Sequence, residues 1–355
     1  MTTFRIAILP GDGIGPEVVA EGVKVLRAVE AMLPGVHYDF AEHAVGAGEY
    51  LRSGNPLPPA TLAKIREAHA ILLGAMGLPE VRWPSGVEMT PQIDLREQLD
   101  LYNGVRPIRL RHEAHTPLKG FGPGPGQRPI DFVIVRENCE GLFAERLTPR
   151  PAGRDFEADT LRITRRGAER ICREAFKLAR RRRKKCTLVD KANVLPSMAF
   201  FRKVFDEVAR EFPEVQTERV YVDAMALFLV QRPDSFDVMV TENMFGDILS
   251  DLGAGIIGGM GMAPSADIGD QHAVFQPSHG TAPTIAGKGI ANPIATILSV
   301  ALMLEWLGAP DAVRGARMIE QAVEDVLAEP ANRTADLGGK LGTAQMGNLV
   351  CQALT

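Results

Sequence analysis

The chain has 355 residues, of which 45% are hydrophobic and 24% charged, and its formal net charge is −4. This is the composition of an ordinary globular protein, and the charge argues against a nucleic-acid partner. No apolar run reaches the roughly 18 residues of a membrane span, and residues 1–10 lack a signal-peptide pattern. The four cysteines show no Cys-x-x-Cys pattern, which indicates reduced thiols. We therefore expect a cytoplasmic protein without membrane contact.

The chain begins with an apolar strand at residues 4–9, a glycine-rich turn at 10–16 and a helix at 17–31. Pro16 stands where the third glycine of a G-x-G-x-x-G dinucleotide fingerprint belongs, so an ordinary Rossmann fold is not expected. Residues 120–129 are expected to form a turn-rich loop, and residues 275–283 a loop without periodicity. Elsewhere strands and helices alternate, which indicates an α/β fold. Strands are predicted at 70–74, 130–135, 186–189, 219–222 and 236–240, and helices at 166–183, 197–211, 224–231, 293–307 and 310–328.

Asp247 and Asp251 form the most informative pair, because they follow the buried strand at 236–240 and lie four residues apart. On a helix these positions share one face. Adjacent carboxylates repel each other unless a cation or solvent separates them, so the pair indicates an oxygen-ligand site for Mg²⁺ or Mn²⁺. The alternative is a solvated pair on an exposed helix.

The basic run at 180–185 has two interpretations. It resembles a nucleic-acid patch, but cations also stabilise the C-terminal end of a helix. We expect it to close the helix at 166–183, in keeping with the negative net charge.

Several long motifs occur in a fixed order. Together they resemble the metal-dependent β-decarboxylating dehydrogenases, the group of isocitrate, isopropylmalate, homoisocitrate and tartrate/D-malate enzymes. The motifs are Gly11-Asp-Gly-Ile-Gly-Pro-Glu17, Leu95-Arg-Glu-Gln-Leu-Asp-Leu-Tyr102 with Arg106-Pro107, Arg136-Glu-Asn138, Asp190-Lys-Ala-Asn193, Tyr221-Val-Asp-Ala224, Thr241 to Asp251, His279-Gly-Thr-Ala-Pro283 and Gly289-Ile-Ala-Asn-Pro293.

The resemblance implies an isocitrate/isopropylmalate dehydrogenase-like α/β fold with two domains around a central cleft. A large, cofactor-side domain would comprise 1–103 and 253–355. A small domain, 104–252, would carry the dimer contacts and most metal and catalytic residues. The resemblance also implies a homodimer.

The substrate implied is a 2-hydroxy acid with a second carboxylate on the neighbouring carbon. Three arginines match those that bind its carboxylates, which suits the planar, permanently charged guanidinium. Positions Thr90 and Gln92 would face the substituent on C3. They match neither the isopropylmalate nor the isocitrate pattern, so the substituent stays open. The arginines are Arg96, Arg106 and Arg136.

The metal ligands implied are Asp247 and Asp251, completed by Asp223 of the partner subunit. Lys191, also contributed across the dimer interface, resembles the general base. A lysine can act so only if burial or nearby positive charge lowers its pKa.

The loop at 279–285 and Asn292 would bind the adenosine half of the cofactor, and Asn193 would lie near its nicotinamide. Thr284-Ile285 lacks the Lys-Tyr pair of NADP-using members, which favours NAD over NADP. The loop residues are His279, Gly280, Thr281, Ala282, Pro283, Thr284 and Ile285.

Two residues depart from the family pattern. Phe143 replaces a tyrosine that helps to protonate the enol after decarboxylation, and a phenyl ring cannot donate a proton. Gln276 replaces a glutamate. The resemblance therefore implies oxidative decarboxylation of a hydroxy diacid. The alternatives are a hydroxy-acid dehydrogenase without decarboxylation, a weakly active or regulatory homologue, and a metal-dependent hydrolase.

Overall fold

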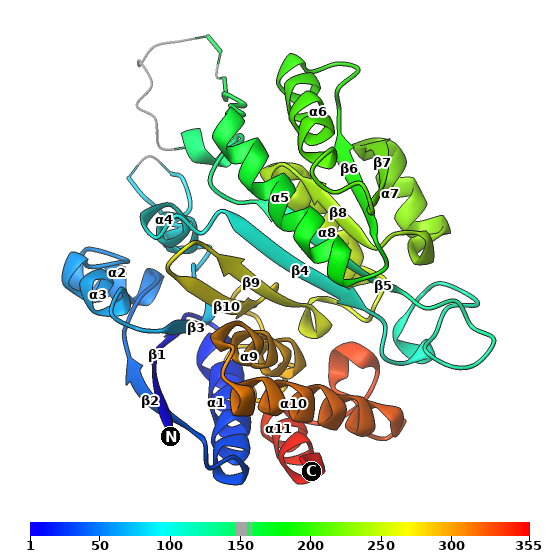
Figure 1. Ribbon diagram of the computed structural model, residues 1–355. Helices are drawn as coiled ribbons and strands as arrows, with labels where there is room; N and C mark the ends of the chain where they lie inside the picture. Colours follow the sequence, from blue (N-terminus) through cyan, green and yellow to red (C-terminus); the bar gives the residue numbers. More distant parts are fainter. Residues whose placement is uncertain (85, 147–154, 157) are drawn as a thin grey trace.

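The structure is a computed structural model in which residues 1–84, 86–146, 155–156 and 158–355 are described. Within these residues ten strands form one sheet, in the order β2-β1-β3-β10-β9-β4-β5-β8-β6-β7 (Figure 1). The strands are β1 (Thr2–Gly11), β2 (Val36–Glu42), β3 (Ala70–Ala75), β4 (Asn103–Arg109), β5 (Asp131–Glu137), β6 (Lys185–Asp190), β7 (Gln216–Tyr221), β8 (Val238–Thr241), β9 (Pro264–Ile268) and β10 (Ala273–Pro277).

The helices alternate with the strands through most of the chain, as predicted. They are α1 (Gly15–Met32), α2 (Ala47–Ser53), α3 (Pro59–Ile65), α4 (Pro91–Gln98), α5 (Arg165–Arg181), α6 (Pro196–Ala209), α7 (Val222–Gln231), α8 (Asn243–Gly255), α9 (Ile294–Leu307), α10 (Pro310–Ala328) and α11 (Thr343–Ala353).

Two parallel groups of strands meet through antiparallel neighbours at the middle of the sheet. β2, β1, β3 and β10 are parallel, as are β5, β8, β6 and β7, whereas β9 and β4 are antiparallel to both of their neighbours. This mixed α/β architecture, with a sheet that differs from a Rossmann sheet, confirms the expected fold class. The division into two domains stays a prediction.

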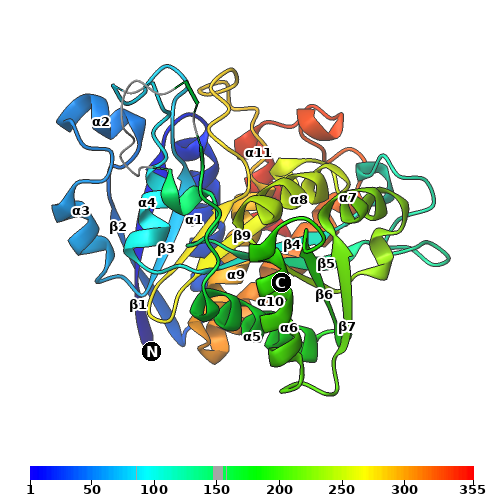
Figure 2. The same ribbon diagram turned by 90° about the horizontal axis from the view of Figure 1, so that it is seen from above.

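Side chains of a strand point alternately to the two faces of the sheet. This alternation determines which side chains pack into the core on each face. On one face Phe132 and Ile134 of β5 pack with α7 and α8, whereas Val133 and Val135 pack with α5 and α6 on the other. α1 and α9 cover that second face beside β1, β3 and β10 (Figure 2). The first face is left partly uncovered over β4, β9 and β10, where the candidate site lies.

The predicted loop at 275–283 is wrong in its first part, because β10 extends to Pro277. A five-residue strand is held there by pairing with β9, which directly precedes it, and with β3, which is far from it in the sequence. The strand predicted at 219–222 ends one residue earlier, so Asp223 lies in the first turn of α7.

The basic run closes α5, as predicted. Arg182 follows the helix and bonds to Asp131 and Asp237 at 2.8 Å each. These contacts hold the helix end against β5 and against the residue that precedes β8. All four cysteines are free thiols. Across the residues that the structure describes, every helix is too short or too polar to cross a membrane.

Candidate active site

A cavity of about 260 Å³ opens on the first face of the sheet, over β4, β9 and β10 and beside the N-terminal half of α8. It brings together residues that lie far apart in the sequence, and much of its wall is charged. Nine predicted site residues line it: Gln92, Arg96, Arg106, Arg136, Phe143, Asp247, Asp251, His279 and Gly280.

Arg136 is held rigidly at the end of β5. Its Nε and Nη2 atoms donate to Asn243 Oδ1 at 3.0 and 2.7 Å, and its Nη1 donates to Asp247. A Cβ at Gly246 would lie 2.6 Å from Arg136 Cγ, so the glycine lets α8 approach the side chain. Burial, followed by the nearby charge of Arg96, lowers the pKa of Arg136 to about 10. The guanidinium therefore stays charged at neutral pH.

Asp267 joins the other two arginines, and sequence reasoning missed it. Its Oδ2 accepts from Arg96 Nε at 2.8 Å, and its Oδ1 accepts from Arg106 Nη2 at 2.8 Å. Asn138 Nδ2 and Gln276 Nε2 donate to the same carboxylate at 2.8 and 2.7 Å. Although burial opposes ionisation, the two arginines lower the pKa of Asp267 far below its usual range. Removing one partner of such a buried pair costs about 3–5 kcal/mol.

Asp267 was hard to recognise in the sequence because its strand, β9, pairs with β4, which is far from it along the chain. A lone aspartate in Pro264-Ser-Ala-Asp-Ile268 has no motif around it. Its role depends on the antiparallel pairing of β9 with β4 and with β10.

Asp247 and Asp251 lie on α8 at the wall of the cavity, as the spacing predicted. The helix begins with a side-chain cap, because Glu242 accepts from the backbone N–H groups of Met244 and Phe245 at 3.1 and 2.6 Å. Burial, and then the Asp247 carboxylate, raises the pKa of Asp251. Within the described ranges, no group of three or more His, Cys, Asp or Glu side chains is arranged to hold a metal ion.

Lys191 and Asp223 lie outside the cavity, at the ends of β6 and β7. Lys191 Nζ contacts Asp223 Oδ1 at 2.6 Å, and the Asp223 side chain is 68% exposed. Lys191, through its hydrogen bond, lowers the pKa of Asp223. Asn193 is exposed beside them. These three predicted residues thus gather on one surface of the subunit, apart from the pocket that their roles require.

The loop after β10 carries the predicted cofactor residues and is fastened to the glycine-rich turn after β1. Ile14 N donates to Thr281 O at 2.9 Å, and a Cβ at Gly13, which has a φ of +59°, would lie 2.1 Å from that oxygen. Glu17 accepts from the backbone N–H of Gly289 at 3.0 Å. The turn that fails as a dinucleotide fingerprint therefore serves to position this loop.

His279 offers an unpartnered nitrogen to the cavity. Its Nδ1 lies 2.9 Å from Gly280 O, and its buried Nε2 has no partner among the described residues. Ala282 and Ile285 pack against Ile14, while Pro283 and Thr284 are exposed.

Three further predicted residues have different surroundings. Asn292 is buried at the base of the loop, where it donates to Asp336 at 3.0 Å and accepts from Ile294 N at 3.0 Å. Thr90 precedes α4 and does not line the cavity. Gln92 does line it, and its buried Oε1 has no partner in the described part of the chain.

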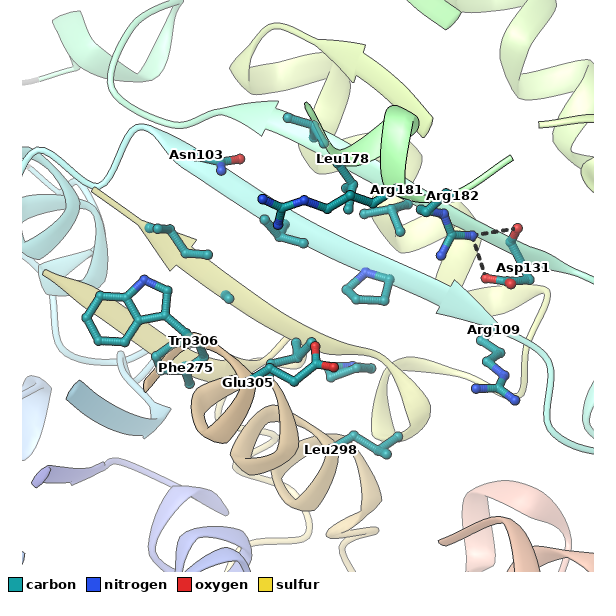
Figure 3. A pocket seen from close by; sticks show the side chains of 18 of the residues that line it. Asn103, Arg109, Asp131, Leu178, Arg181, Arg182, Phe275, Leu298, Glu305 and Trp306 are labelled. Carbon is teal, nitrogen blue, oxygen red and sulfur yellow. Dashed lines mark hydrogen bonds and ion pairs between the residues drawn. The ribbon is translucent and has the colours of Figure 1, made fainter. Parts of the chain in front are cut away.

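A larger cavity, of about 630 Å³, lies on the opposite face of the sheet, between α5 and α9 (Figure 3). Val105 and Pro107 of β4 line it, whereas Arg106 between them faces the smaller cavity. Its wall includes Trp306, and its cations include Arg182, which is already paired with Asp131 (Figure 3). We place the candidate site in the smaller cavity because the arginines and the aspartate pair converge there.

Comparison with known proteins shows the family of the chain. A family model described as isocitrate/isopropylmalate dehydrogenase matches residues 5–350. The chain is 45% identical to "3-isopropylmalate dehydrogenase" of Thermotoga maritima, covering 99% of both chains. It is 44% identical to "isocitrate/homoisocitrate dehydrogenase" of Thermus thermophilus, covering 99% of this chain and 98% of the relative. The solved isocitrate dehydrogenase of Methylococcus capsulatus superimposes with a TM-score of 0.88 at 39% identity, covering 99% of both chains.

The fold, the cavity and these full-length relatives define a dehydrogenase, an enzyme of the oxidoreductase class. The chain belongs to the isocitrate/isopropylmalate dehydrogenase family.

Proposed function

We propose that this enzyme oxidises and decarboxylates a 2-hydroxy dicarboxylic acid, with NAD as oxidant and Mg²⁺ or Mn²⁺ as the metal. The observation that carries the proposal is the convergence of three arginines with the Asp247–Asp251 pair around one small cavity. The arginines supply charge for an anionic substrate, and the aspartates supply oxygen ligands for a hard cation.

The arginines support recognition of carboxylates. Arg96 donates to Asp267 through its Nε, and its two Nη groups have no partner among the described residues, so they can receive a carboxylate. A guanidinium edge can hold a carboxylate with two parallel hydrogen bonds. Arg136 is fixed by Asn243 and would give up its contact with Asp247 when a cation binds that aspartate.

Asp247 and Asp251 supply only two carboxylates for a divalent cation, which supports a metal site shared between two subunits. Asp247 and Asp251 would hold the metal together with Asp223 of the partner subunit. When bound, such a cation polarises a substrate hydroxyl and stabilises negative charge on oxygen.

The surface around Lys191 supports a homodimer in which that residue works in the neighbouring cavity. Large apolar side chains are exposed on this surface, and α7 and α8 lie side by side there (Figure 2). Such a patch favours association with another subunit. In the partner's cavity, Lys191 would take the proton of the hydroxyl group. The exposed apolar residues are Val194, Tyr221, Leu227, Val230 and Ile248.

The loop at 279–285 supports a dinucleotide on the open side of the cavity. His279 Nε2 is a buried nitrogen without a partner in the described residues, and it would bind the cofactor. When bound there, NAD would supply the acceptor for a hydride from C2 of the substrate. NAD is favoured over NADP because Thr284 and Ile285 offer no cation for a 2′-phosphate.

Phe143 affects the last step of the proposed reaction, the protonation of the enol after decarboxylation. Its ring lines the cavity, and the guanidinium carbon of Arg136 lies 5.6 Å from the ring centroid. The ring closes the pocket but has no proton to give. Protonation of the enol would then fall to a water or to Lys191 of the partner subunit.

A substrate panel tests the proposal. Reduction of NAD⁺ and of NADP⁺ is measured with Mn²⁺ present, against D-malate, tartrate, isocitrate, isopropylmalate and homoisocitrate. We expect turnover of at least one hydroxy diacid with NAD⁺, and loss of turnover with a chelator or on Asp251→Asn. The matched control is Asp325→Asn, on the exposed side of α10. Cofactor binding without turnover of any of them would favour the regulatory homologue.

A further inference from the structure

The buried carboxylate of Asp267 lies between two arginines of the proposed substrate site. It accepts four hydrogen bonds, two on each oxygen, from Arg96, Arg106, Asn138 and Gln276. The residue is 1% exposed, so the carboxylate has no access to solvent. Its contacts therefore determine how the two guanidinium groups are oriented.

Arg96 and Arg106 make different hydrogen bonds within the protein. Arg106 Nη1 donates to the carbonyl oxygens of Val105 and Ala266 at 3.2 and 3.1 Å, while its Nη2 donates to Asp267. Arg96 bonds to Asp267 through Nε alone, which leaves its outer edge facing the cavity. The carboxylate thus holds Arg106 against the sheet and presents the free edge of Arg96 to a ligand.

The position of Gln276 explains why a carboxylate is needed at 267. Gln276 is a neutral amide, so Asp267 carries the only negative charge of this pair of side chains. Both side chains lie on the same face of the β9–β10 pair, and Gln276 Nε2 is 2.7 Å from Asp267 Oδ2. Asp267 thus supplies the negative charge of the pair, in direct contact with the arginines.

We propose that Asp267 is a positioning residue for substrate binding, which balances the charge of the two arginines and fixes the edge of Arg96 that receives a substrate carboxylate. The inference rests on the proposed function for the identity of the ligand, a dicarboxylate. Without the carboxylate, two buried guanidinium groups would face each other uncompensated, with Arg136 as a third cation nearby. They would move apart, and the site would lose its prearranged geometry.

A charge swap between the two strands tests the inference. Asp267→Asn should raise the KM for the preferred hydroxy diacid by about 10²-fold, as expected when binding groups are misplaced by about 1 Å. The KM for NAD should not change. Asp267→Asn combined with Gln276→Glu should recover most of the loss, because the pair again carries one negative charge. Gln276→Glu alone should impair binding, because two carboxylates would then be in contact.

Asp237→Asn is the matched control. Asp237 is also 1% exposed and bonds to Arg182 at 2.8 Å, but it lies away from the cavity. We expect it to destabilise the fold without changing the substrate KM. A substrate KM that stays at the wild-type value in Asp267→Asn, or one that the swap does not restore, would overturn the inference.

Two further measurements keep the test decisive. If Asp267→Asn does not fold, Asp267→Glu retains the charge and shifts it by one methylene group. A raised substrate KM in that variant supports positioning, and an unchanged KM refutes it. Binding of malonate, an unreactive dicarboxylate, is measured by calorimetry with Mn²⁺ in every variant. If the wild type turns over no hydroxy diacid, the proposed function fails, while the order of malonate affinities still tests Asp267.

Discussion

The proposed sharing of one site between two subunits predicts the outcome of a mixing experiment. Asp223→Asn and Asp251→Asn are each expected to inactivate the homodimer, because each removes a ligand from both cavities. In a mixed dimer, the cavity of the Asp223→Asn subunit keeps its own Asp247 and Asp251. It also receives an intact Asp223 from the partner subunit. That cavity is complete, while the other lacks two ligands.

The magnitude follows from the arrangement of the residues. Lys191 and Asp223 are paired at 2.6 Å on the exposed surface, outside the cavity that contains Asp247 and Asp251. Half of the dimers in an equal mixture are mixed, and each has one complete site of two. Activity should therefore return to about one quarter of the wild-type value in a two-fold symmetric dimer.

The assay unfolds and refolds the two variants together and measures reduction of NAD⁺ with Mn²⁺ and the preferred substrate. Variants refolded separately and then combined on ice provide the control without exchange. Asp223→Asn should fold normally, because an exposed ion pair contributes about 0–1 kcal/mol. Recovery of no activity, with mixed dimers present, would refute the shared site. Substantial activity of Asp223→Asn alone would refute it as well.

Three more predictions follow from the structure. Phe143→Tyr should speed the release of the protonated keto product by up to about 10²-fold where that step limits turnover; an unchanged rate in a quenched-flow assay would contradict the role given to this position. Leu227→Asp places a charge on an apolar side chain that is 53% exposed, so light scattering should show monomers and the activity should be lost; an intact dimer would contradict the interface. His115 is 4% exposed, both ring nitrogens lack partners in the described residues, and burial lowers its pKa to about 4. Since the unfolded chain takes up this proton below about pH 6.5, stability should fall by up to about 3 kcal/mol as the pH drops towards 4. Urea unfolding of His115→Gln should lose that pH dependence, whereas His112→Gln should keep it.

Much of the fold could be predicted because local patterns determine it. The helix at Gly15–Met32 and the strand before Asp247 have strong apolar periodicity and clear boundary residues. The helix periodicity also placed Asp247 and Asp251 together at one wall. β10 was missed because it is short, and because β3, one of its pairing partners, is far from it in the sequence.

The site residues that belong to sequence motifs were predicted. The site residue whose position depends only on strand pairing was missed. Arg96, Arg106 and Arg136 were identified from family motifs, and the structure brings all three to one cavity. Asp267 connects two of them and has no motif of its own. Its position depends on strand register, which no local pattern in the sequence specifies.

The most direct test of the account is the ratio of CO2 released to NADH formed with the preferred hydroxy diacid and Mn²⁺. The account predicts one CO2 for each NADH, with both lost on Asp251→Asn. NADH formed without CO2 would contradict it, because the enzyme would then oxidise the hydroxyl group and retain the second carboxylate.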